Sequence, residues 1–232
     1  MTVKAKAIIA AFYGTGPKRS YWNGCSTGGR QAIMEASRFP ADFDGILAGA
    51  AANPKTHQDA WRIWMAQAMS KDPASAIPPS KFPMIHQAVL GVCDALDGLK
   101  DGLIDDPSRC PFDPKTIECK GQDASSCLTP AQVQTAKVIM SAVHDRQTGV
   151  EIFPGLEAET ELAWPPRPEP IPVAVDLYRD IIFGNPNWDW HPFDIERDLA
   201  FADKATQGNL SPISADLSAF AQRGGKLLMY HG

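Results

Sequence analysis

The pattern G-x-S-x-G, centred on Ser26 within residues 21–30 (Y-W-N-G-C-S-T-G-G-R), constrains the fold of this chain most. It predicts a sharp, strained turn between a strand and a helix, with the Ser26 hydroxyl exposed above a sheet. Gly24 and Gly28 are expected to flank the turn because a side chain at either position would collide with the neighbouring strand or helix. The amide of Thr27, at the start of the helix, is expected to point toward a developing oxyanion.

The surrounding sequence supplies the context that this motif requires. Residues 20–23 are short and aromatic, as in a strand, and residues 29–39 carry apolar side chains at helical spacing. Residues 45–48 (G-I-L-A) indicate the next buried strand. An ordinary turn of small residues is the alternative explanation. The order of strand, turn, helix and strand favours Ser26 as a nucleophile.

Composition is typical of a globular protein and excludes little else. The 232 residues are 44% hydrophobic and 21% charged. A net charge of −5 argues against nucleic acid or an anionic membrane as a partner. No segment of the sequence approaches the length of a transmembrane helix.

Four of the five cysteines form two local pairs. Cys93 and Cys110 bracket an acidic loop, and Cys119 and Cys127 bracket a polar one. A disulfide that closes the first loop, of about 18 residues, would contribute about 3 kcal/mol in the chain-entropy model. Four free thiols or a zinc site are the alternatives, although the chain has no C-x-x-C pair. Disulfides predict an oxidising compartment, and hence a secreted or periplasmic protein whose signal peptide is absent from this sequence.

Cys25 is the cysteine left over, directly before Ser26. It is an inert buried thiol, a nucleophile in its own right, or one half of a disulfide whose partner lies beyond Gly232. The geometry of the turn aims residue 26 rather than residue 25, which disfavours the second reading.

The acidic loop at residues 93–106 (C-D-A-L-D-G-L-K-D-G-L-I-D-D) has spacing that suits a hard cation. Calcium prefers six to eight oxygen ligands. The loop offers the carboxylates of Asp94, Asp97 and Asp101, and the backbone carbonyls of Leu99 and Leu103. The alternative is a solvated Asp-Gly turn. Close packing of carboxylates is unfavourable without a cation, and a disulfide across the loop favours the metal.

The remaining sequence predicts a large insert. Helices are expected at residues 57–70, 80–92 and 129–143, and irregular structure is expected in the proline-rich stretch 154–192. Five of the six tryptophans fall in the insert, at positions 61, 64, 164, 188 and 190. They indicate either a lid that binds a planar group or the insert's own core. His57, His86, His144 and His191 are interpreted as surface or satisfied polar residues.

A catalytic serine needs a base and an orienting carboxylate. In hydrolases with this turn the chain order is serine, acid, histidine. Residues 226–230 (K-L-L-M-Y) predict a late core strand, and the sequence ends two residues after it. His231 could be the base, but no acid-bearing strand and loop precede it. This abrupt end suggests a fragment of a longer protein. Residues 1–12 are expected to form an amphipathic helix whose apolar run is too short for a secretory leader.

Taken together, these motifs resemble the tannase and feruloyl esterase family of serine esterases. The matching segments are N-G-C-S-T-G-G-R-Q (23–31), F-P-x-D-F-D-G-I-L-A-G-A (39–50), C-D-x-x-D-G-x-x-D-G (93–102), D-P-x-x-C (106–110) and K-L-L-M-Y-H-G (226–232). The resemblance implies an α/β fold: an incomplete α/β-hydrolase core at residues 1–52 and 204–232, and a mainly helical and irregular lid at 53–203. It also implies structural calcium at the acidic loop.

The resemblance further implies hydrolysis of aromatic esters, galloyl or feruloyl, through an acyl-enzyme on Ser26. Family members link the cysteine before the serine to one beside the catalytic histidine, which would give Cys25 a partner outside this chain. Their acid and base follow the position of Gly232, so this chain alone is expected to be inactive. The competing hypothesis is a non-catalytic calcium-binding relative or scaffold.

Overall fold

The chain divides into two compact units, and the boundaries between them fall within two helices. The computed structural model describes residues 1–70, 72–165, 168–211 and 216–231. Unit 1 contains Met1–Gln58 and Phe201–Gly232, and unit 2 contains Asp59–Ala200. The unit boundaries differ from the predicted 53–203 because α3 (Lys55–Ser70) and α7 (Ile195–Thr206) contribute residues to both units. Pro166 and Gly232, which belong to predicted segments, lie outside the described residues.

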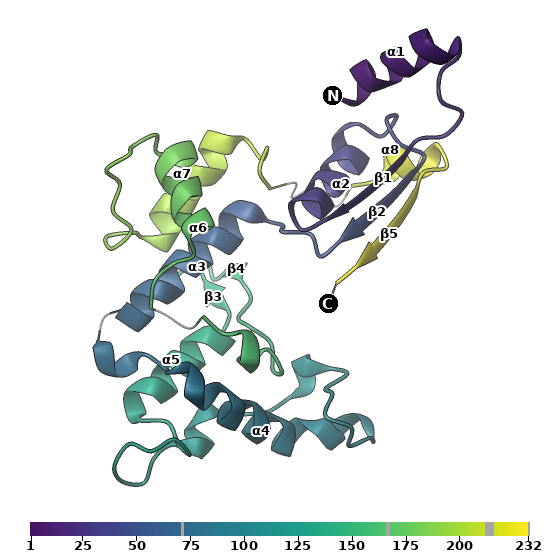
Figure 1. The fold of residues 1–232 in the computed structure, drawn as a ribbon. Helices are drawn as coiled ribbons and strands as arrows, with labels where there is room; N and C mark the ends of the chain where they lie inside the picture. Colours follow the sequence, from purple (N-terminus) through teal and green to yellow (C-terminus); the bar gives the residue numbers. More distant parts are fainter. Residues whose placement is uncertain (71, 166–167, 212–215, 232) are drawn as a thin grey trace. The chain divides into compact units, whose positions relative to one another are not determined.

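Unit 1 is built on a three-stranded parallel sheet with the order β1-β2-β5. The strands are β1 (Tyr21–Cys25), β2 (Gly45–Gly49) and β5 (Lys226–Tyr230), as the sequence predicted to within two residues at each end. Helix α2 (Thr27–Arg38) connects β1 to β2 and lies against both strands (Figure 1). The strand register places Cys25, Gly49 and Tyr230 side by side at the carboxyl ends of the three strands. The residues that follow the three strands therefore emerge at the same edge.

The core of unit 1 depends on small side chains on α2. Ala32 and Ala36 are buried against Phe43, Ile46 and Ala48, and Phe220 of α8 (Ser218–Gln222) completes the cluster. Alanine lets the helix approach the sheet closely, so the turn between β1 and α2 is tight. The first helix, α1 (Thr2–Tyr13), forms as predicted but buries none of its residues.

Unit 2 is mainly helical. Its core includes Ile63, Ile85, Val89, Val133 and Ile139 from three helices. The bounds of its elements are α4 (Phe82–Cys93), α5 (Pro130–Met140), β3 (Val143–His144), β4 (Glu151–Phe153), α6 (Pro172–Asp176), a π-helical turn (Leu177–Ile182), and 3-10 turns at Pro73–Ser75, Pro79–Lys81, Asp94–Asp97, Pro107–Arg109, Pro114–Ile117 and Glu161–Ala163. No helix among the described residues of either unit is both long and apolar enough to cross a membrane.

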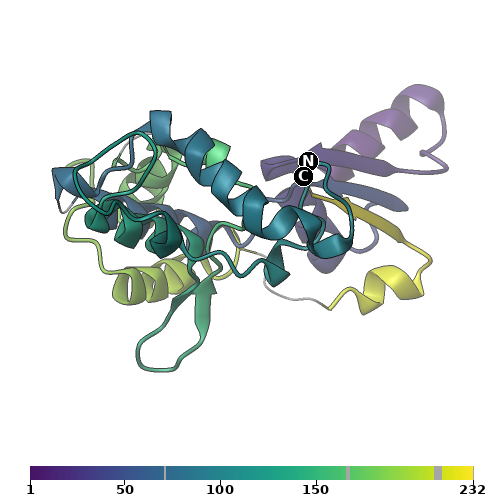
Figure 2. The same ribbon diagram turned by 90° about the horizontal axis from the view of Figure 1, so that it is seen from below.

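Several predicted element boundaries in unit 2 need correction. Helix α5 starts at Pro130 after the N-cap residue Thr129, as expected, and Thr129 also forms a capping box with Gln132. The helix ends at Met140 rather than at residue 143. Val143 instead begins an antiparallel hairpin with β4, which the sequence did not predict. The hairpin projects from the helices of unit 2 (Figure 2). The proline-rich stretch is also less irregular than predicted, because α6 continues into the π-helical turn and buries Tyr178.

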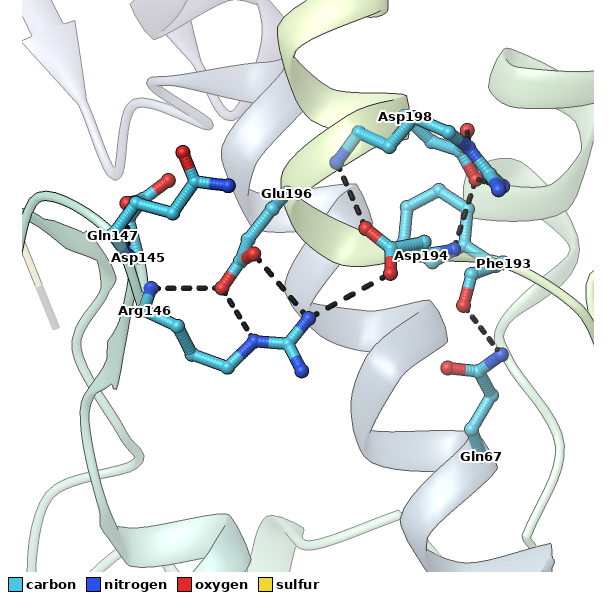
Figure 3. Close-up of polar contacts among 9 residues, drawn as sticks. Gln67, Asp145, Arg146, Gln147, Phe193, Asp194, Glu196 and Asp198 are labelled. Carbon is cyan, nitrogen blue, oxygen red and sulfur yellow. Dashed lines mark hydrogen bonds and ion pairs between the residues drawn. The ribbon is translucent and has the colours of Figure 1, made fainter.

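Polar contacts also hold segments of unit 2 together. The amide and the guanidinium of Arg146, next to β3, both donate to Glu196 of α7 at 2.8 Å (Figure 3). The Gln67 side chain donates to the carbonyls of Trp190, His191 and Phe193 at 2.7–3.2 Å. These contacts fix the segment before α7 against α3.

The predicted lid tryptophans serve mostly as core. Trp164 is buried against Phe82, with ring centroids 6.2 Å apart, and Trp188 stacks with Tyr178 and Phe183. Trp61 is 4% exposed and packs on Phe153. Among the described tryptophans of unit 2, this favours the core interpretation over a planar-ligand cover.

Both predicted disulfides are present in unit 2. Cys93 bonds to Cys110, and Cys119 bonds to Cys127. The second pair is anchored by the buried Lys81, whose ammonium donates to the carbonyl of Cys127 and to Gln132, both at 2.8 Å. The free-thiol and zinc alternatives for these four cysteines are therefore wrong.

Candidate active site

Ser26 occupies the strained turn that the sequence predicted. It links β1 to α2 with φ 58° and ψ −116°, a backbone conformation that is unfavourable for a residue with a side chain. Its side chain is exposed. Strain of this kind, of order 1–3 kcal/mol, persists only where the surroundings hold the residue in place.

Three backbone hydrogen bonds hold Ser26 in this conformation. Its amide donates to the carbonyl of Gly49 at 2.9 Å. Its carbonyl accepts from the amide of Arg30 at 3.0 Å and from the amide of Ala52 at 3.3 Å. The segment after β2 therefore supports the turn after β1.

Two glycines allow β1, α2 and β2 to approach one another closely, but only one of them is at a predicted position. A β-carbon on Gly24 would lie 2.6 Å from the carbonyl oxygen of Gly28, so the prediction for Gly24 is confirmed. The prediction for Gly28 is wrong, because a β-carbon placed there would meet no atom of a neighbouring strand or of another helix within 4 Å. The crowded position is Gly29, where a β-carbon would lie 2.3 Å from the carbonyl oxygen of Gly49.

Thr27 is the first residue of α2 and follows Ser26 directly. The amides of the first helical turn have no partner within the helix, and the helix dipole adds positive potential there. The Thr27 amide is therefore placed where it could donate to an oxyanion formed next to Ser26.

Neither a base nor an acid is joined to Ser26 in the described part of the chain. His231 follows β5, two strands from β1, so its backbone lies about 10 Å from the turn at the usual strand spacing. No hydrogen bond links the Ser26 hydroxyl to a histidine or carboxylate among the described residues. His231 as base thus has no geometric support.

His57, predicted to be a surface or satisfied polar residue, has a carboxylate partner within unit 1. His57 Nε2 lies 3.0 Å from Asp203 Oδ2, and Thr56 donates its hydroxyl to Asp203 Oδ1 at 2.7 Å. Burial raises the pKa of Asp203, but the hydrogen bonds from His57 and Thr56 outweigh it, and the pKa lies below its ordinary value. This pair connects the start of α3 to the end of α7.

His86 and His191, also predicted to be surface or satisfied polar residues, have carboxylate partners in unit 2. His86 lies 3.0 Å from the fully buried Glu161, and His191 lies 2.6 Å from Asp189. Both pairs belong to unit 2 alone. Cys25, in contrast, is a free and exposed thiol at the end of β1, so the reading of a buried inert thiol is wrong.

The acidic loop of unit 2 is curled by its own hydrogen bonds. Asp94 is buried, and its Oδ1 accepts from the amides of Asp101 (3.2 Å) and Gly102 (3.0 Å). Asp97 and Asp101 each accept from the amide two residues later, at 2.8 and 3.2 Å.

The donor set of this loop fits a cation only in part. No group of three or more His, Cys, Asp or Glu side chains among the described residues is arranged to hold a metal ion. Buried Asp94, however, takes part in no ion pair within that part of the chain, and the curl brings residues 101 and 102 beside it.

The parallel sheet, the helix behind it and the strained serine turn between them define an α/β-hydrolase-like fold. A profile described as Tannase and feruloyl esterase matches residues 1–169, and the chain belongs to this family.

Relatives and solved structures agree with this assignment. The chain is 35% identical over 235 residues to a probable feruloyl esterase B-1 of Aspergillus flavus, covering 99% of this chain and 44% of that protein. It is 34% identical to an uncharacterized esterase of Xanthomonas campestris pv. campestris, covering 98% and 43%. The crystal structure of feruloyl esterase B from Aspergillus oryzae superposes with a TM-score of 0.92 at 33% identity, covering 100% and 47%. The chain thus spans a little under half the length of these relatives.

Sequence reasoning missed the residues that support the turn from a distance. Gly29 could have been found, because a second glycine after Gly28 is unusual inside a helix. Arg30, Thr56 and Ser211 carried no local signal, because their contacts join positions more than 150 residues apart.

Proposed function

We propose that this chain carries the nucleophile of a serine carboxylic-ester hydrolase. The single observation that supports this most is Ser26, exposed at φ 58° and held by hydrogen bonds at both its amide and its carbonyl. A hydroxyl fixed in this way loses little further freedom when it attacks.

The proposed reaction has two steps. Ser26 Oγ attacks the ester carbonyl carbon and loses its proton to a base, and the oxyanion accepts a hydrogen bond from the Thr27 amide. The alcohol then leaves with a proton, which forms an acyl-serine. Water attacks the acyl-serine, releases the carboxylic acid and restores the Ser26 hydroxyl.

We further propose an aromatic acyl group, feruloyl or galloyl, as the substrate class. Support comes from the names of the relatives, which are feruloyl esterases, and from the family description. The base and acid would come from sequence outside these 232 residues, and so would the disulfide partner of Cys25.

The test is hydrolysis of methyl ferulate and methyl gallate by the product of the full reading frame that contains this chain. Wild type should release the acid, and Ser26→Ala should abolish release. Thr27 acts through its backbone, so Thr27→Ala should keep most of the activity and serves as the matched control. Activity retained by Ser26→Ala would refute the proposal.

Calcium at the acidic loop is a second part of the proposal. Asp94, Asp97 and Asp101 would supply carboxylates, and Leu99 and Leu103 would supply carbonyls. Binding requires Asp97 and Asp101 to turn from the amides of Leu99 and Leu103 toward Asp94. The burial of the Asp94 carboxyl group beside residues 101 and 102 supports this role, because a cation offsets the cost of burying a carboxylate.

The competing function is a non-catalytic calcium-binding relative. A full-length protein that binds calcium but hydrolyses neither ester would favour it. Under either function we propose an oxidising compartment, secreted or periplasmic, because two disulfides support one.

A further inference from the structure

We infer that Arg30 is a positioning residue for the Ser26 turn, acting through a closed ring of hydrogen bonds within unit 1. This inference rests on the proposed function for its kinetic consequence. The ring joins Arg30 to two segments of unit 1, residues 52–56 and 203–211, where the chain leaves this unit and returns to it.

The ring begins at Ser26 and runs along α2. The Ser26 carbonyl accepts from the Arg30 amide at 3.0 Å. The half-buried guanidinium of Arg30 donates through Nη1 to the carbonyl of Leu210 at 2.9 Å. One side chain thus connects the helix behind the nucleophile to the returning segment.

The ring closes through Ser211 and Thr56. Ser211, next to Leu210, is 1% exposed, and its hydroxyl accepts from the amide of Thr56 at 3.1 Å. Thr56 lies four residues after Ala52, whose amide donates back to the Ser26 carbonyl at 3.3 Å. Thr56 also holds Asp203 of α7.

Such a ring supplies what a strained serine requires, because Ser26 is held from α2 and from the segment after β2 at once. Loss of Arg30 would leave Leu210 and Ser211 free to shift, and the Thr56 to Ala52 segment would follow. The nucleophile would then move relative to the oxyanion amide. A displacement of about 1 Å at a reacting atom can cost about 100-fold in rate.

The chain offers a matched control on the same helix. Arg38 donates to the same returning segment, to Asn209 Oδ1 at 2.6 Å and to the carbonyl of Gly208 at 3.0 Å. It is exposed and lies eight residues further along α2, about 12 Å away from Arg30 at the helical rise. If Arg30 only anchored the returning segment, replacing Arg30 and replacing Arg38 would have equal effects.

The first experiment measures amide hydrogen exchange in the 232-residue chain. Arg30→Gln should speed exchange at the Ala52 and Thr56 amides at least tenfold, Arg30→Lys should do so less, and Arg38→Gln should leave both unchanged. Ser211→Ala removes the hydroxyl that accepts from the Thr56 amide and should speed exchange at the same two amides. This variant tests the ring even where Arg30→Gln does not fold. Unchanged exchange in both ring variants, or equal effects from the two arginines, would overturn the inference.

The second experiment measures ester hydrolysis by the full-length enzyme. Arg30→Gln should lower kcat by roughly 10- to 100-fold with KM nearly unchanged, and Arg30→Lys should recover part of the loss. Wild-type kcat in Arg30→Gln, beside an inactive Ser26→Ala, would refute the positioning role while the proposed function stands. An enzyme with no Ser26-dependent hydrolysis would refute the proposed function, and the exchange data would then decide the inference alone.

Discussion

The backbone of Gly29 lies so close to Gly49 that a β-carbon on Gly29 would sit 2.3 Å from the Gly49 carbonyl oxygen. The same carbonyl accepts the amide of Ser26 at 2.9 Å. One oxygen therefore both fixes the backbone of Ser26 and sets how near α2 can approach β2.

Gly29→Ala should destabilise the chain by about 1–3 kcal/mol, because the added methyl group forces helix and strand apart. Gly28→Ala is the matched control and should be neutral or slightly stabilising, since the position is open and alanine favours helix. Urea unfolding of both variants measures the difference. Equal costs at the two positions would contradict the packing described for the turn.

Replacing Cys93 and Cys110 with alanine should cost about 3 kcal/mol, because the unfolded chain regains the freedom of a loop of about 18 residues. The Cys119–Cys127 pair closes a shorter loop, so its double replacement should cost slightly less. Urea unfolding under non-reducing conditions tests both. A larger loss at the shorter loop would show that Lys81, rather than loop entropy, dominates there.

Calcium should raise the thermal midpoint of the chain if the acidic loop binds it. Calcium at about 100 times its Kd stabilises by about 2.7 kcal/mol through mass action. Asp94→Asn should remove this gain, and Asp72→Asn, outside the loop, should not. A midpoint that is the same in excess EGTA and in calcium would contradict the calcium proposal.

Asp203 should contribute to the acid sensitivity of the fold. Its folded pKa is lower than the unfolded value of about 3.9, so the stabilisation is present above that value. It is lost as pH falls through the folded pKa. Asp203→Asn should therefore flatten the decline of unfolding free energy below about pH 4. A wild-type slope in this variant would contradict the assigned hydrogen bonds from His57 and Thr56.

Short-range signals in the sequence predicted most of unit 1. The turn at Ser26 and the strands at β1, β2 and β5 each carry their pattern within a few residues. Gly28 shows the limit of a local pattern. The motif predicts crowding at Gly28, but the position of β2 places the crowding at Gly29 instead.

The elements of unit 2 and the contacts between distant segments were harder to predict. The hairpin from Val143 to Phe153 has only a few paired residues, too short for a periodic pattern. Contacts such as Arg30 to Leu210 join distant positions, so only the folded chain reveals them. Disulfides were predictable because cysteines are rare and their spacing was local.

The most direct measurement is mass spectrometry of the full-length protein, quenched with acid during turnover of methyl ferulate. The account predicts a feruloyl adduct on the peptide that contains Ser26 and no adduct in Ser26→Ala. An adduct on Cys25 or on any other residue, or turnover that persists in Ser26→Ala, would contradict it.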